Sequence, residues 1–120
     1  MDNVVREDPD LLINGLDELN EKLTEYNLSK DDILCADLLF NGNHFILYSD
    51  HTEDELNDML QFLNQKYYNG FGAQYLEGKI FMKDAKTWFS RGEYDGSEWW
   101  NYYKYNIPDE LKKSYEWWYT

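Results

Sequence analysis

This sequence has little proline, little basic charge and a single cysteine. Because Cys35 has no second cysteine to pair with, an internal disulfide is excluded, and a reducing cytoplasmic setting is expected. Eleven Lys and Arg residues stand against twenty-four Asp and Glu residues, which gives a formal net charge of −13. Binding of nucleic acid through its phosphates needs clustered Lys and Arg, so direct nucleic-acid binding is not expected. An anionic membrane surface would repel the chain for the same reason.

Membrane-spanning and secretory segments are also lacking. No apolar run approaches the roughly 18 residues that a transmembrane helix needs. The first residues offer neither the basic region nor the apolar stretch of a signal peptide. Disordered chains are poor in aromatic residues, whereas 18% of these residues are aromatic. We therefore expect one folded domain, residues 1–120, in the cytoplasm.

The acidic charge that is present is confined to one half of the chain. Residues 1–60 hold sixteen acidic and three basic residues, whereas residues 61–120 hold eight of each. The first half therefore carries the whole net charge of −13. Aromatic residues show the opposite distribution, with four in the first half and eighteen in the second. Such asymmetry bears on partners and association rates, and it predicts an anionic surface with a separate aromatic region.

Two helices are expected in the acidic half. The first should span residues 9–26, with Asp8 as its cap and Pro9 in its first turn. The second should begin at the capping box formed by Thr52 and Glu55. Both helices carry an apolar stripe that should face the core. The stripes comprise Leu12, Leu16, Leu19, Leu23 and Tyr26 in the first helix, and Leu56, Met59, Leu60, Leu63 and Tyr67 in the second.

Five strands are expected around these helices. Residues 33–40 and 44–49 form a hairpin around Asn41-Gly42, which suits a tight two-residue turn. Residues 75–82, 87–94 and 98–105 then alternate with a period near two and are joined by short turns. A short further helix could begin at Pro108. We predict an α+β fold, in which a hairpin and a three-stranded meander form one antiparallel sheet with both helices on one face.

The exposed sides of the two helices are the first candidate binding surface. Carboxylates along a helix can substitute for the phosphates that a cationic nucleic-acid groove binds. Plain solvation of a cytoplasmic protein is the alternative explanation. The acidic residues on which the binding hypothesis rests are Asp17, Glu18, Glu21, Glu25, Glu53, Asp54 and Asp58.

Aromatic side chains near the C-terminus are the second candidate surface. Alternation places Trp99, Asn101, Tyr103 and Tyr105 on one face of the last strand, and Trp100 and Tyr102 on the other. Because both faces carry aromatics, one set should belong to the core. Exposed Trp is a favoured interface anchor, and Trp99, Trp117 and Trp118 are the candidates.

One segment shows a resemblance to other proteins. Residues 91–102, with the pattern R-x-E-Y-D-G-S-E-W-W-x-Y followed by Ile107-Pro108, resemble a stretch in small bacteriophage and prophage proteins. The similarity covers roughly the last third of the chain and is weaker through the second helix. No activity is attached to that stretch, so the resemblance implies a source in mobile genetic elements, and hence the cytoplasm of an infected bacterium.

Catalytic and metal-binding patterns are weak. Asp95 and Glu98 could serve a small hydrolase as a carboxylate pair, although turn chemistry explains Asp95 more simply. His44 and His51 lie near Asp50 and Asp54, but their spacing matches no ligand motif. Cys35 lies in an apolar strand and is expected to be a buried thiol. We expect neither a cofactor nor a metal, and we do not expect an enzyme.

These observations favour a phage-borne inhibitor that acts by binding. Its partner would be a host protein with a cationic nucleic-acid-binding groove, such as a CRISPR effector or another defence nuclease. In this hypothesis the acidic helices mimic nucleic acid and the exposed aromatics anchor the contact. The alternative is a carbohydrate- or protein-binding module that uses an aromatic sheet surface, and a small hydrolase is a more distant third.

Overall fold

The computed structural model describes residues 12–70 and 73–105. The five main strands are β2 (Ile33–Phe40), β3 (Asn43–Leu47), β5 (Leu76–Met82), β6 (Thr87–Tyr94) and β7 (Ser97–Lys104). They form one antiparallel sheet in the order β3-β2-β5-β6-β7. The remaining elements are α2 (Gly15–Glu25), the short 3-10 helix η2 (Lys30–Asp32), α3 (Glu53–Leu63), and an antiparallel pair of two-residue strands, β1 (Ile13–Asn14) and β4 (Lys66–Tyr67). The expected α+β fold is confirmed.

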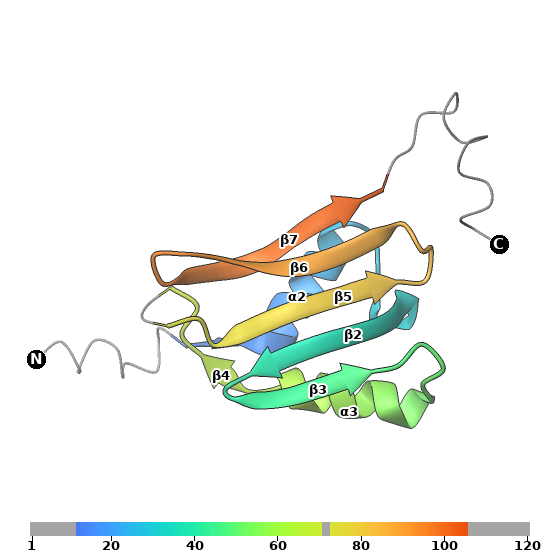
Figure 1. Ribbon diagram of the computed structural model, residues 1–120, viewed down its shortest axis with the longest axis horizontal. Helices are drawn as coiled ribbons and strands as arrows, with labels where there is room; N and C mark the ends of the chain where they lie inside the picture. Colours follow the sequence, from blue (N-terminus) through green and yellow to red (C-terminus); the bar gives the residue numbers. More distant parts are fainter. Residues whose placement is uncertain (1–11, 71–72, 106–120) are drawn as a thin grey trace, which may run out of the picture.

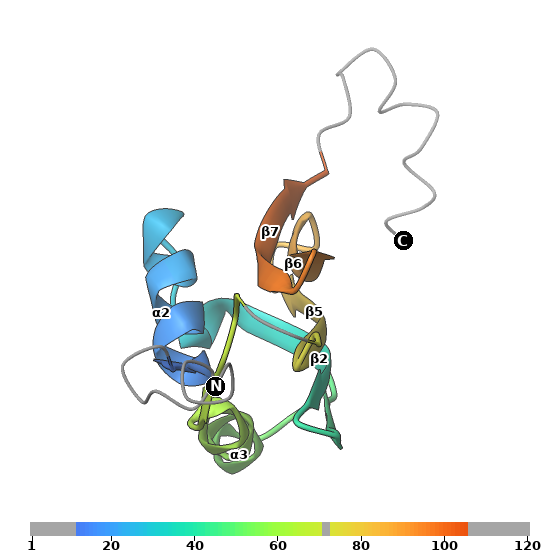
Figure 2. The ribbon, with the colours of Figure 1, turned by 90° about the vertical axis from the view of Figure 1, so that its left-hand side faces the viewer.

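Both helices lie on the same face of the five-stranded sheet, as Figure 2 shows from the side. Seen through the sheet, α3 lies behind β3 and α2 lies behind the middle of the sheet (Figure 1). We call α2 and α3 together the helical layer. The face of the sheet turned away from them, which no other described element covers, is called the open face.

Two tight turns set the register of the sheet. Asn41-Gly42 joins β2 to β3, and Asp95-Gly96 joins β6 to β7. All four residues have positive φ angles, between 51° and 87°, as the expected turn chemistry requires. Phe40 therefore pairs with Asn43, and Tyr94 pairs with Ser97. Because side chains alternate between the two faces of a strand, this register determines which aromatics reach the open face.

The second helix begins where the sequence predicts. Thr52 caps α3. Its hydroxyl accepts a hydrogen bond from the Glu55 N–H, and its own N–H donates to Glu55 Oε1 over 2.8 Å. The predicted stripe is buried from Leu56 to Leu63. Tyr67 is buried as predicted, but its placement in the helix is wrong, because α3 ends at Leu63 and Tyr67 lies in β4.

The first helix begins later than the sequence predicts. Ile13 and Asn14 pair with Tyr67 and Lys66 as a strand, and the Asn14 side chain caps α2. Leu12 therefore lies outside the helix, and Leu16 is only half-buried, so only Leu19 and Leu23 of the expected leucine stripe are fully buried. The caps expected at Asp8 and Pro9 lie outside the described residues, as does the helix suggested at Pro108.

The core fills the space between the helical layer and the inner side of the sheet. Tyr26, which directly follows α2, stacks on Tyr102 of β7, with ring centroids 3.7 Å apart. The rest of the core is mostly aliphatic, and burial of such side chains is the main favourable term in folding. Its fully buried members include Leu19, Leu23, Leu38, Phe40, Met59, Leu63, Ile80 and Phe89.

The different burial of two leucines on α2 leads to a first prediction. Leu19→Ala should lower the free energy of unfolding by about 2–5 kcal/mol, because it leaves a cavity in the core. Leu16→Ala should cost less than half as much, because Leu16 is only half-buried. Urea denaturation followed by circular dichroism measures both. Equal losses for the two variants would contradict the orientation of α2.

Candidate binding surfaces

The helical layer presents the acidic residues that the sequence singles out. On α2, Asp17, Glu21 and Glu25 are exposed and lie four residues apart, which corresponds to steps of about 6 Å along the helix. The only basic residue on α2 or α3 is Lys22, which lies 3.6 Å from Glu25. The acidic residues of α3 are exposed as well, namely Glu53, Asp54, Glu55 and Asp58.

Glu18 has a different place from the one expected. Its side chain is half-buried, and its Oε2 atom lies 3.2 Å from Nη1 of Arg91 on β6. Its Oε1 atom accepts a hydrogen bond from the hydroxyl of Tyr67 on β4. Glu18 therefore belongs to an internal ion pair and must be removed from the predicted anionic surface. The helical layer keeps seven exposed carboxylates.

The partner of Glu18 is the guanidinium group of Arg91, whose side chain is fully buried. Arg91 Nη2 lies 2.8 Å from Glu98 Oε1 and donates to the Tyr67 hydroxyl, also over 2.8 Å. Arg91 Nε donates to the Leu76 carbonyl over 3.3 Å, and the guanidinium carbon lies 4.9 Å from the centre of the Trp100 ring. We call Arg91, Glu18, Glu98, Tyr67 and Trp100 the Arg91 cluster. It joins α2, β4, β6 and β7, and it reaches the start of β5.

Glu98 is the second carboxylate partner of the Arg91 guanidinium. Its Oε2 accepts from the Tyr75 N–H over 2.8 Å, and its Oε1 accepts from the Leu76 N–H over 3.0 Å. Both carboxylate oxygens thus have donors, as a buried charge requires. The side chain is fully buried, so no described surface offers it to a substrate. This arrangement speaks against Glu98 as the acid or base of a hydrolase. Asp95 forms the tight turn that precedes Glu98.

Two pKa values reflect this enclosure. Burial raises the pKa of Tyr67, which keeps its hydroxyl a donor to Glu18. Burial opposes the charge of Arg91, but the Glu18 carboxylate and the other partners outweigh it and raise the pKa of Arg91 above its usual value. The guanidinium therefore stays charged inside the protein. The alternation of side chains along β6 gives one indication that Arg91 is buried. Arg91 falls on the same face of the strand as the buried Thr87 and Phe89.

The open face carries the exposed apolar side chains. Nine large apolar residues are exposed in the described part of the chain, and six of them lie in strands at positions that point to this face. Tyr48, Tyr75 and Tyr105 directly adjoin strand ends where the alternation points the same way. The six exposed residues that lie within the strands themselves are Leu39, Ile46, Phe81, Tyr94, Trp99 and Tyr103.

Among the expected aromatic anchors, Trp99 lies on the open face and is 39% exposed. Its Nε1 donates to the Asn101 side chain over 2.8 Å. Trp100 points the other way into the core, so the alternation of β7 is as expected. Trp117 and Trp118 lie outside the described residues.

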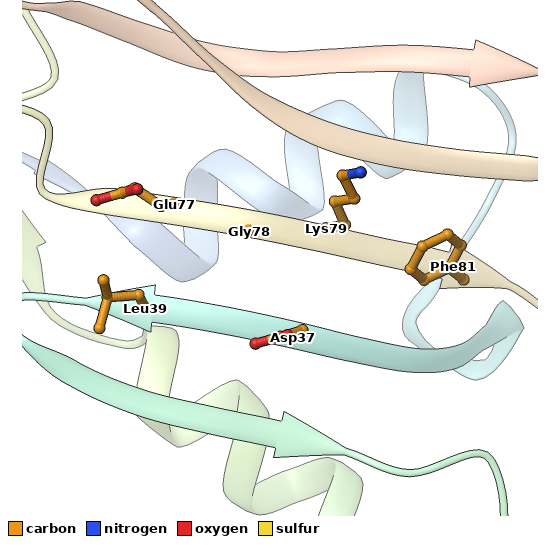
Figure 3. A pocket seen from close by; sticks show the side chains of 6 residues that line it. All are labelled: Asp37, Leu39, Glu77, Gly78, Lys79 and Phe81. Carbon is orange, nitrogen blue, oxygen red and sulfur yellow. The ribbon is translucent and has the colours of Figure 1, made fainter.

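A shallow hollow lies at the centre of the open face (Figure 3). Asp37 and Leu39 of β2 face Glu77, Lys79 and Phe81 of β5 across it. Gly78, at φ 129°, lies between them, and a Cβ atom there would come 2.0 Å from the Asp37 carbonyl oxygen. Glycine is therefore required for the two strands to approach so closely.

The cysteine and the two histidines have ordinary structural surroundings. For Cys35 the sequence predicts a buried thiol; the residue lies on the open face and is half-buried, and this partial burial raises its pKa. His44 Nε2 lies 2.6 Å from Asp37, and His51 Nδ1 lies 2.6 Å from the Tyr48 carbonyl. Within residues 12–70 and 73–105, no three His, Cys, Asp or Glu side chains gather as metal ligands.

The Arg91 cluster yields a prediction about stability. Glu98→Gln removes one charge and leaves the guanidinium with an incomplete buried partner set, so we expect a loss of about 3–5 kcal/mol in the free energy of unfolding. Glu21→Gln is the matched control, because Glu21 is exposed and should change stability by no more than about 0.5 kcal/mol. Thermal and urea unfolding measure both variants. Similar small effects would mean that the cluster does not hold the fold together.

Comparisons with known proteins leave the function to be argued from this geometry. No protein-family model matches the chain, and neither does a curated protein or a solved structure. Neither of the two described helices is long and apolar enough to cross a membrane. The surfaces that remain to be explained are the acidic helical layer and the apolar open face.

Proposed function

We propose that this protein is a small binding protein that inhibits a nucleic-acid-acting partner by presenting an anionic surface in place of nucleic acid. The observation that carries the proposal is the helical layer, where seven exposed carboxylates accompany a single lysine. Solubility alone does not require charge of one sign to be gathered on one layer of the fold.

The density of charge on this layer supports the proposal. A DNA duplex carries one phosphate charge per about 1.7 Å of axis, so about 12 Å of duplex carries roughly seven. The helical layer offers the same number of carboxylates on two helices of eleven residues, each about 16 Å long. A groove lined with Lys and Arg for a phosphate backbone would therefore attract this layer, and long-range attraction would speed association.

The partner class follows from this chemistry and from the resemblance of residues 91–102 to phage proteins. A phage benefits from blocking host proteins that act on nucleic acid, such as a CRISPR effector or another defence nuclease. Binding in the cationic groove would exclude the nucleic-acid substrate, so inhibition needs no catalytic residue. The site of action would be the cytoplasm of the infected bacterium.

The open face supports the alternative of a protein- or carbohydrate-binding module. Trp99, Tyr103 and Phe81 form an apolar surface there that solvation does not explain. Aromatic rings stack on sugars and on protein surfaces alike, and Asp37, Glu77 and Lys79 supply hydrogen-bonding groups on the same face. A role for the open face is compatible with the anionic mechanism, because the two surfaces lie on opposite sides of the sheet (Figure 2).

Affinity capture tests the proposed function. The immobilised chain should retain a host protein from a nuclease-treated bacterial lysate at low salt and lose it at high salt, because exposed charges are screened within about 8 Å at physiological ionic strength. Added DNA or RNA should release the captured protein by competing for its groove. Retention of the captured protein that changes neither with salt nor with added nucleic acid would contradict the proposal.

A pair of variants locates the surface responsible. Glu21→Lys with Glu25→Lys reverses two charges on α2 and should weaken the captured complex by at least about tenfold. Asp31→Lys with Asp50→Lys makes the same change in net charge at exposed positions outside α2 and α3 and should leave much more of the affinity. Biolayer interferometry with the captured protein compares them. Equal losses would show that only the overall charge matters, against a specific anionic surface.

A further inference from the structure

We propose that the open face is a dimer interface and that its occupant is a second copy of this chain. The inference does not rest on the proposed function. It begins from the exclusive placement of exposed large apolar side chains, which in the described residues lie on this face or at strand ends that adjoin it. The rest of the described surface, including the helical layer, exposes none of this size.

The exposed apolar area of the open face is large enough for a specific dimer interface. Large apolar side chains expose about 200 Å² each when free, and these nine are mostly about 40% exposed, which gives roughly 700 Å² per copy. Two such faces together would bury about 1,400 Å², within the range of about 1,200–2,000 Å² for stable protein complexes. The largest apolar patch of a typical monomer is about 300–600 Å².

The charges at the centre of this face are arranged to complement themselves. Glu77 and Lys79 lie two residues apart on β5 and both project from the open face beside Gly78 (Figure 3). Neither side chain has an ion-pair partner among the described residues, where the five ion pairs involve other groups. Asp37 lies opposite Lys79 in the register, but its Oδ1 atom lies 2.6 Å from His44 Nε2 and forms no ion pair with Lys79. Each copy therefore offers one charge of each sign without an ion pair near the middle of its central strand.

A twofold axis satisfies both charges at once. If the axis passes beside Gly78 and runs across the strands, β5 of the two copies lies antiparallel and face to face. Glu77 of each copy then lies opposite Lys79 of the other, and every contact occurs twice, as in an isologous dimer. Two twisted sheets can pack face to face in this way at about 10 Å.

The strong net charge of the chain does not prevent this arrangement. Both helices of a chain lie on the face of the sheet opposite the open face (Figure 2). Face-to-face packing would therefore leave the two helical layers on the outer sides, with both sheets between them. That separation exceeds the screening length of about 8 Å at physiological ionic strength. The open face itself carries only Asp37 and Glu77 against Lys79, apart from His44, so it is close to neutral. The dimer would present one acidic helical layer on each side.

Sedimentation of the full chain in an analytical ultracentrifuge tests the proposal. As concentration rises, the mass should pass from 14.5 kDa towards twice that value. Lys79→Glu places carboxylates opposite each other and should weaken dimerisation by at least about tenfold. The double variant Glu77→Lys with Lys79→Glu restores opposite charges and should recover most of the affinity. Lys66→Glu, an exposed residue on β4, is the matched control and should leave the dimer intact.

Circular dichroism establishes that each variant is folded, so a monomeric variant reports on the interface. A native chain that stays monomeric at every concentration would overturn the proposal. So would a dimer that Lys79→Glu leaves unchanged, or a charge swap that fails to restore it in folded protein. A monomer whose open-face aromatic signals respond instead to an added peptide or sugar would assign this face to another ligand and would also overturn the proposal.

Discussion

The buried guanidinium of Arg91 is the constraint on which much of this structure depends. A charge inside a protein is tolerated only when its partners surround it closely, and removal of one partner is strongly destabilising. Arg91 finds its partners on α2, β4 and β7 and on the carbonyl that starts β5. The contacts of this one side chain therefore tie these elements together. The cluster therefore fixes α2 on the sheet through Glu18, and the next turns of that helix carry Glu21 and Glu25 outward.

Local chemistry made most of the fold predictable, and long-range pairing accounts for the errors. The Thr52 capping box and the Asn-Gly and Asp-Gly turns act within four residues, so the sequence indicates them directly. The start of α2 depends instead on Ile13 pairing with Tyr67, more than fifty residues away. Glu18 lies one residue after Asp17, outside the series of Asp17, Glu21 and Glu25, but its burial depends on contact with Arg91 in the distant strand β6. The two faces of β7 were predictable, but which one is buried depends on where the helices pack.

Residues 91–102 have a clear structural role. Arg91, Glu98 and Trp100 of that segment belong to the buried cluster, and Asp95-Gly96 makes the turn that brings β6 and β7 together. Glu93 accepts a hydrogen bond from the Gly96 N–H over 3.0 Å and supports the same turn. This segment therefore encodes a β-hairpin that carries an internal ion pair. Only Trp99 and Tyr94 of the segment contribute large side chains to the open face.

The central claim is that the fold separates an anionic surface from an apolar one and that the anionic surface meets cationic partners. Amide chemical shifts of the isotope-labelled chain, recorded while a short oligolysine peptide is added, test this claim most directly. The account predicts saturable shifts confined to α2 and α3, and their reversal by salt. Shifts centred on β5, β6 and β7, or spread evenly over all acidic residues, would contradict it.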